Sequence, residues 1–154
     1  MRNLFFCLLT AIVFASCKKD SFTTTPQIKF KNINPNVWSR EFTSLTQGPV
    51  LTLELTDAEG DLGFDQGKDT AFVYVKNITI PPFETDSFRF PDLPISDKSN
   101  LSVDVDVLIT EALASSNRPN PHTDTLYFDV YVKDFAKNKS NTIRTSKPVY
   151  YISP

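Results

Sequence analysis

The sequence predicts an all-β chain that folds as one antiparallel β-sandwich of about seven strands. Apolar and polar residues alternate with a period of two along several segments, as in strands with one buried and one solvated face. The 11 prolines lie almost entirely between those segments, where proline ends strands. Helical periodicity is weak: only residues 109–115 carry the pattern of a short turn, and Asn117, Pro119 and Pro121 then stop it.

Seven segments carry the strand pattern, in chain order 27–33, 51–56, 70–80, 87–90, 101–109, 126–133 and 143–152. The alternation is clear in the second, where Leu51, Leu53 and Leu55 share one face. In the third, the apolar positions change sides near residues 76 and 77, which predicts a bulge or a change of sheet there. The short fourth segment suits a sheet edge, and the fifth and sixth alternate along their whole length. One apolar and one polar face per strand favour antiparallel sheets.

Composition limits the classes of partner. The chain has 154 residues, which is the size of a single domain, and a net charge of −2. A slightly acidic chain has no basic field for a phosphate backbone, so we expect no nucleic-acid partner. Cys7 and Cys17 are the only cysteines in the sequence, and both lie near its start. Because the rest of the chain has no cysteine, we expect that its core is held by packing and not by a disulfide.

The first residues carry the features of an export signal. Arg2 gives a positive start, residues 4–14 form an almost unbroken apolar run, and small Ala15 and Ser16 precede Cys17. This arrangement resembles a bacterial lipoprotein signal, which implies that residues 1–16 are a cleaved signal peptide and that Cys17 is lipidated. An ordinary secretory signal or an uncleaved membrane helix are the alternatives, but the apolar run is much shorter than the roughly 20 residues that a spanning helix needs.

The residues that follow resemble the tether of a surface lipoprotein. Residues 18–20 (Lys-Lys-Asp) are similar to the charged segment of Bacteroidota-type cell-envelope lipoproteins, and residues 17–25 are expected to form the lipidated start and a flexible tether. The resemblance implies that the protein lies in the cell envelope, lipid-anchored to the outer membrane on its periplasmic or exterior face. The membrane is then a partner through the lipid anchor.

The end of the chain resembles a known hairpin. Residues 132–143 are similar to the last hairpin of bacterial immunoglobulin-like domains, whose pattern is Asp-x-Ala-Gly-Asn-x-Ser. The matching residues are Asp134, Ala136, Asn138 and Ser140, while Lys137 stands in place of the glycine. The resemblance implies that residues 26–154 form an immunoglobulin-like sandwich. That fold hosts many unrelated functions, so it does not identify one.

Acidic residues gather after the second expected strand, at Asp57, Glu59, Asp61, Asp65 and Asp69. In an immunoglobulin-like topology this connection shares an end of the sandwich with the last hairpin, which brings Asp134 and Asn138 near. Oxygen ligands at alternate positions suit Ca²⁺, so Asp57, Glu59, Asp61, Asp69 and Asp134 are a candidate calcium site. The alternative is a set of turn residues, in which Asp57 and Asp134 bond to nearby backbone.

Residues for catalysis are few. His122 is the only histidine, and it is expected in a loop near Ser115 and Ser116. A nucleophile needs an oriented base and an oxyanion pocket, and the sequence indicates neither. We therefore expect that the protein is not an enzyme.

The other end of the expected sandwich carries Trp38, Phe42, Phe83 and His122, which are candidate contacts for a protein or glycan partner. The alternative is that Trp38 and Phe42 fold back and close the end of the sandwich. The sequence thus favours a membrane-anchored, non-catalytic binding or structural module. A calcium-binding structural domain that uses residues 57–69 is the second hypothesis, and an enzyme of unknown type is the third.

Overall fold

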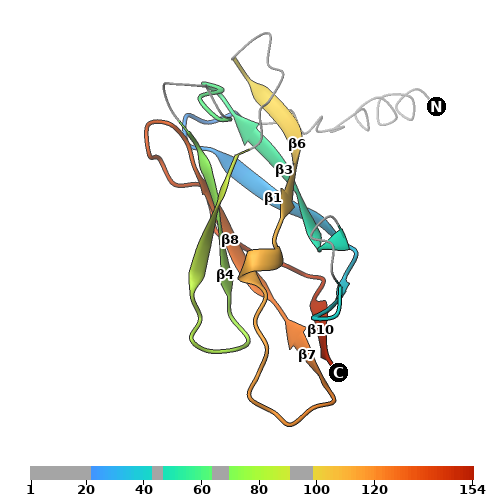
Figure 1. Ribbon diagram of the computed structural model, residues 1–154. Helices are drawn as coiled ribbons and strands as arrows, with labels where there is room; N and C mark the ends of the chain where they lie inside the picture. Colours follow the sequence, from blue (N-terminus) through green and yellow to red (C-terminus); the bar gives the residue numbers. More distant parts are fainter. Residues whose placement is uncertain (1–21, 43–46, 64–69, 91–98) are drawn as a thin grey trace, which may run out of the picture.

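The computed structural model describes residues 22–42, 47–63, 70–90 and 99–154, which form strands joined by turns and short 3-10 segments (Figure 1). The elements in chain order are β1 (Gln27–Asn34), β2 (Val37–Ser39), β3 (Val50–Asp57), β4 (Phe72–Asn77), β5 (Thr85–Arg89), β6 (Leu101–Leu108), η2 (Thr110–Ala112), β7 (His122–Leu126), β8 (Phe128–Lys133), β9 (Ile143–Arg144) and β10 (Val149–Ser153). The predicted all-β class is confirmed. In the described residues, no helix is long and apolar enough to cross a membrane.

The strands form a sandwich of two main layers. One antiparallel sheet has the order β1-β3-β6, and the other has the order β5-β4-β8-β9. A smaller sheet, β2-β10-β7, extends the second layer, because β7 continues into β8 with only Tyr127 between them. This order fits the immunoglobulin-like connectivity that the last hairpin predicts, with the fourth expected strand in the second layer.

One apolar core lies between the layers. Leu51, Leu53 and Leu55 of β3 are buried on one side, as their alternation predicts. Val130 and Val132 of β8 are buried on the other side. Each such side chain contributes roughly 1.5–3 kcal/mol when it is fully buried. The register of β3 on β6, from Val50↔Leu108 to Asp57↔Leu101, keeps the apolar faces of both strands turned inward.

The change of sides in the third expected strand has a different cause from the one expected. β4 ends at Asn77, and the chain turns there instead of forming a bulge or entering another sheet. The Oδ1 atom of Asn77 accepts hydrogen bonds from the N–H groups of Thr79 (2.9 Å) and Ile80 (3.2 Å), which fixes the turn. A shift of register is present in β1, between Phe30 and Asn32.

Two ends of the sandwich can be distinguished. At the first, which we call the N-terminal end, the Thr23 carbonyl accepts a hydrogen bond from the Ala58 N–H (2.9 Å), so the start of the described chain lies beside the turn after β3. The hairpin between β8 and β9 lies at this end too. The turn between β4 and β5 and the connection from η2 to β7 lie at the other end, which we call the opposite end (Figure 1).

Candidate functional site

The acidic turn at the N-terminal end begins with Asp57, the last residue of β3, which is fully buried. Its Oδ2 atom accepts a hydrogen bond from the Gly60 N–H at 2.5 Å, and Gly60 has a positive φ of 63°, a conformation that glycine adopts at little cost. Its Oδ1 atom is buried and has no hydrogen-bond partner among the described residues. Asp57 Oδ2 therefore stabilises the turn, while Oδ1 accepts no hydrogen bond from the described residues.

The hairpin after β8 is ordered by Asp134, which is also fully buried. Asp134 Oδ1 accepts a hydrogen bond from the Asn138 N–H (2.7 Å), and its Oδ2 accepts one from Asn138 Nδ2 (2.9 Å). Lys137 has a φ of 70°, at the position where the resembling pattern carries glycine. The expected turn role of Asp134 is present in the structure.

The two turns meet, as the immunoglobulin-like topology predicts. The Phe135 N–H donates a hydrogen bond to the Asp61 carbonyl (3.0 Å). Burial, followed by the nearby charges of Asp61 and Asp134, raises the pKa of Asp57, and burial and the charge of Asp134 raise the pKa of Asp61. The Oδ1 atom of Asp61 is buried without a partner among the described residues, like that of Asp57. Unsatisfied buried oxygens and raised pKa values mark excess negative charge at this point.

Of the other predicted members of the calcium site, Glu59 and Asp134 lie among the described residues. Glu59 is exposed, and Asp65 and Asp69 lie outside the described residues. Asp134 uses both of its oxygens on Asn138. In the part of the chain that the structure describes, no three side chains of His, Cys, Asp or Glu are arranged to hold a metal ion.

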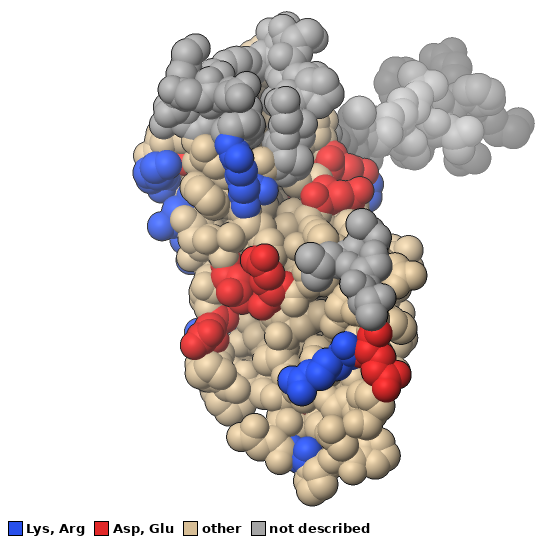
Figure 2. Space-filling model, in the orientation of Figure 1, with Lys and Arg blue, Asp and Glu red and all other residues tan. Residues whose placement is uncertain are grey.

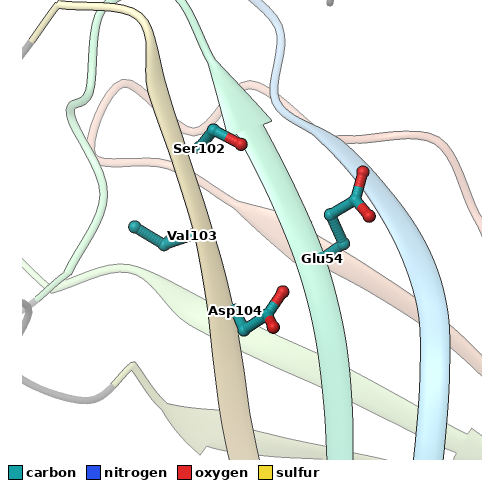
Figure 3. Close-up of a pocket in the computed structure, with 4 residues that line it drawn as sticks. All are labelled: Glu54, Ser102, Val103 and Asp104. Atoms are coloured by element: carbon teal, nitrogen blue, oxygen red, sulfur yellow. The ribbon is translucent and has the colours of Figure 1, made fainter.

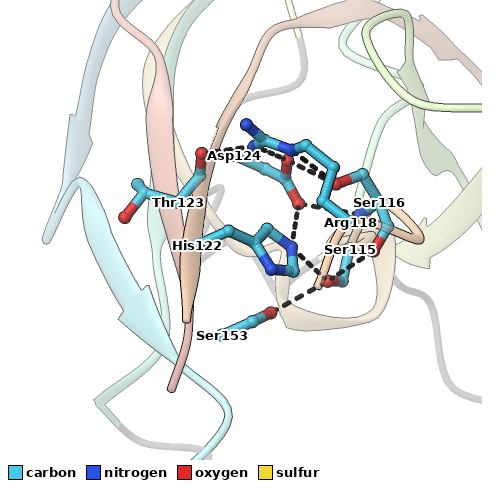
Figure 4. Close-up of polar contacts among 7 residues, drawn as sticks. All are labelled: Ser115, Ser116, Arg118, His122, Thr123, Asp124 and Ser153. Atoms are coloured by element: carbon cyan, nitrogen blue, oxygen red, sulfur yellow. Dashed lines mark hydrogen bonds and ion pairs between the residues drawn. The ribbon is translucent and has the colours of Figure 1, made fainter. Parts of the chain in front are cut away.

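His122 lies at the start of β7 and not in a loop, and its side chain is only 7% exposed. Its Nε2 atom is 3.2 Å from Asp124 Oδ2 and 3.4 Å from Ser115 Oγ (Figure 4). Its Nδ1 atom has no partner among the described residues. In a Ser-His-Asp triad the serine and the carboxylate contact different ring nitrogens, so this arrangement is not a triad.

Asp124 is the centre of this cluster. It accepts hydrogen bonds from the Ser116 N–H (2.7 Å) and Oγ (2.8 Å), and it pairs with Arg118. Burial acts to raise the pKa of Asp124, but the hydrogen bonds from Ser116 and Arg118 and the charge of Arg118 outweigh it and lower the pKa to about 2. Ser115 Oγ is also 2.9 Å from Ser153 Oγ of β10. The cluster therefore fastens the connection after η2 to β7 and β10.

This cluster was missed by sequence reasoning, because its members are up to 38 residues apart. The available signal was the spacing of His122 and Asp124, which puts both side chains on one face of a strand. This spacing is informative only if β7 is recognised as a strand. Pro119 and Pro121, which come directly before it, favour a loop instead.

The predicted partner contacts differ in exposure. Trp38 is 8% exposed and belongs to the core, with Phe42 edge-on against it at 5.4 Å between ring centroids. The buried position of Trp38 therefore agrees with the alternative in which Trp38 and Phe42 close the end of the sandwich. Phe42 remains 43% exposed and Phe83 45% exposed, whereas the side chain of His122 is only 7% exposed. Of the four, Phe42 and Phe83 offer apolar surface to solvent.

Two further surfaces lie on the outer faces of the sheets, and on both of them lysine side chains contact the acidic or aromatic residues. An open depression over β3 and β6 is lined by Glu54, Ser102, Val103 and Asp104 (Figure 3), and its carboxylates bond to lysines: Lys29 to Glu54 (2.6 Å) and Lys31 to Asp104 (2.7 Å).

On the other layer, Tyr74 and Tyr131 stack at 4.7 Å between centroids. Lys133 lies over the ring of Tyr74 at 5.3 Å, and Lys139 lies over that of Tyr131 at 4.1 Å. Because these ring faces are covered, the pair does not form an open platform for a sugar.

Comparisons of the chain with protein-family models, with curated proteins and with solved structures found no match. The function is therefore argued from the residues and their geometry.

Proposed function

We propose that the protein is a lipid-anchored, non-catalytic binding module of the cell envelope, held by Cys17 and open to a partner at the opposite end of the sandwich. The observation that carries this proposal is the separation of the two ends. The described chain begins beside Ala58, whereas exposed Phe83 and a small pocket beside it lie at the opposite end.

The anchor in this proposal rests on the first seventeen residues. Each buried methylene of an acyl chain contributes about 0.8 kcal/mol, and one chain alone holds a protein only reversibly. A lipoprotein cysteine carries two or three chains, so attachment would be lasting. The hydrogen bond from the Ala58 N–H to the Thr23 carbonyl, at the N-terminal end of the sandwich, supports an anchor on that side and an opposite end that points away from the bilayer.

The binding surface in this proposal is the turn between β4 and β5. Phe83 is 45% exposed there and has a φ of 57°, which is uncommon for a bulky residue. An exposed aromatic side chain on a turn between two paired strands suits a contact with a protein partner. A protein is favoured over a glycan because the pocket beside Phe83 has a volume of only about 80 Å³.

Photo-cross-linking in intact cells tests the position of this surface. The variant Phe83→p-benzoylphenylalanine is expected to give one discrete cross-linked species. The control Ser102→p-benzoylphenylalanine, on the outer face of β6, is expected to give none. Absence of any adduct at position 83, or the same adduct at both positions, would contradict the proposed surface.

A second candidate function is calcium binding at the N-terminal end, and the two unused oxygens favour it. The Oδ1 atoms of Asp57 and Asp61 are buried without partners among the described residues, and Asp134 adds negative charge nearby. A hard cation is the natural partner of such oxygens, with water and backbone carbonyls completing six to eight ligands. Calcium would then hold the turn after β3 against the last hairpin. Thermal unfolding with calcium and with a chelator tests this candidate.

A further inference from the structure

The hairpin between β8 and β9 carries a cluster of three lysines. Lys133 is the last residue of β8, and Lys137 and Lys139 follow in the turn, where both are exposed. We call these three residues the lysine hairpin. Lys133 and Lys139 pair in an isolated antiparallel bridge, so two positive charges lie directly opposite each other. Like charges in this position destabilise a sheet, so the fold alone gives no reason for the pair.

The backbone at the turn favours a residue other than lysine. Lys137 has a φ of 70°, a conformation that glycine adopts at little cost and that is unfavourable for a residue with a Cβ atom. Its side chain is exposed, so it adds no packing to the core, but it adds a third positive charge to the hairpin. Residues that break a local rule without a gain for the fold are expected at functional sites.

The charge of the lysine hairpin is not balanced within the described part of the chain. None of its three ammonium groups forms an ion pair with a described carboxylate, and those of Lys133 and Lys139 lie over tyrosine rings instead. The nearby acids Asp57 and Asp134 are fully buried, so an anion that approaches from solvent meets the lysines first. Figure 2 shows basic side chains gathered on the side of the molecule where this hairpin lies in Figure 1.

The lysine hairpin is bonded to the start of the described chain. The Ile28 N–H donates to Asn141 Oδ1 (2.8 Å), and Asn141 Nδ2 donates to the Ile28 carbonyl (2.9 Å). Thr23 lies at the same end, where its carbonyl accepts from the Ala58 N–H. Residues 17–23 span at most about 22 Å when extended, so a lipid on Cys17 would keep the hairpin near the bilayer.

We propose that the lysine hairpin contacts the phosphate groups of anionic lipids in the membrane that holds the anchor. The proposal rests on the lipid anchor proposed above and adds a second, electrostatic contact to it. Lysines within a Debye length of an anionic bilayer, which is about 8 Å at physiological salt, are attracted to its surface. A phosphate between Lys133 and Lys139 also relieves their mutual repulsion. Tyr74 and Tyr131 beside them are half-buried, and tyrosine suits the region of the lipid headgroups.

The test uses the full-length protein, purified from membranes and reconstituted into vesicles. One set of vesicles is phosphatidylcholine, and the other is an equimolar mixture of phosphatidylcholine and phosphatidylglycerol. Both contain a lipid with a nitroxide on its headgroup, which quenches a fluorophore attached to Ala136→Cys in the hairpin. We expect stronger quenching in the anionic vesicles, and we expect high salt to remove the difference. A fluorophore on Ser102→Cys, on the outer face of β6, is expected to be quenched equally in both sets.

Charge variants show whether the lysines are responsible. Lys137→Gln and Lys139→Gln are each expected to lower the equilibrium constant for docking of the hairpin about fivefold, because each removes one charge near the surface. Arg40→Gln also removes one positive charge, but from the opposite end, where the Arg40 N–H bonds to the Ile152 carbonyl of β10. It is expected to dock as the parent does. Equal quenching at position 136 in both vesicle sets, or docking that the lysine variants leave unchanged, would overturn the proposal.

Flotation of the same vesicles separates this proposal from the anchor. A protein that floats with neutral vesicles but shows no preference for anionic lipid at position 136 keeps the anchor and rejects the lysine contact. A protein that fails to float with neutral vesicles rejects the anchor. Flotation with anionic vesicles alone, if salt and the lysine variants abolish it, would then support the lysine contact without the anchor.

Discussion

Replacement of Asp124 by alanine is expected to lower the free energy of unfolding by about 2–4 kcal/mol. Asp124 accepts hydrogen bonds from Ser116 and Arg118 and contacts His122, and its side chain is 4% exposed. Alanine leaves these donors without their acceptor and frees the connection after η2 from β7. Urea unfolding, followed by the fluorescence of the single tryptophan, Trp38, measures the change.

Asp129 provides the matched control. It also pairs with an arginine, Arg144, at 2.8 Å, but on the surface of β8 and β9. An exposed pair contributes about 1 kcal/mol or less, so Asp129→Ala is expected to change stability much less than Asp124→Ala. Equal effects of the two variants would contradict the role assigned to the buried cluster.

The dependence of the parent protein's stability on pH also tests the role of Asp124. The pKa of Asp124 is lowered from 3.8 to about 2 in the folded state. The folded state therefore favours the charged form, and its stabilising contribution of about 2 kcal/mol is complete above pH 3.8. That contribution is lost as the pH falls through about 2, and Asp124→Asn is expected to lack this part of the acid dependence.

Calcium is expected to raise the melting temperature at neutral pH if it binds between Asp57 and Asp61. At a calcium concentration about 100-fold above the dissociation constant, the gain is about 2.7 kcal/mol, which corresponds to a shift on the order of 5–10 °C for a chain of this size. Thermal unfolding in calcium and in EDTA measures it. Equal melting temperatures under the two conditions would reject the site.

Two variants sharpen the calcium experiment. Asp57→Asn removes one charge from the buried group, so it is expected to raise stability in EDTA and to abolish the calcium shift. Glu59→Gln changes an exposed neighbour and is expected to keep the shift. The pH dependence has the opposite sign to that of Asp124: because burial raises the pKa of Asp57, stability in EDTA falls as the pH rises from 3.8 through the raised value.

Much of the sandwich could be predicted because each long strand carries its own signal. The alternation that puts Leu51, Leu53 and Leu55 on one face is visible without the rest of the fold, and so is the pattern of β6 and β8. The expected turn roles of Asp57 and Asp134 follow from local chemistry in the same way.

The parts that could not be predicted depend on distant residues. β2 has three residues, too few for alternation to be seen, and it exists because it pairs in parallel with β10, far along the chain. The small pocket beside Phe83 is lined by the β4–β5 turn and by the segment that contains η2, and these two segments are well separated in sequence. The cluster around Asp124 requires that β7 begin at His122, directly after a segment rich in proline.

The central claim is that a lipid on Cys17 holds this sandwich at a membrane. Metabolic labelling with an alkyne analogue of palmitate, in cells that express the full chain, tests it most directly. The parent protein is expected to carry the label and to stay with the membrane fraction, and Cys17→Ala to lose both properties. Label on the Cys17→Ala variant, or none on the parent protein, would contradict the claim.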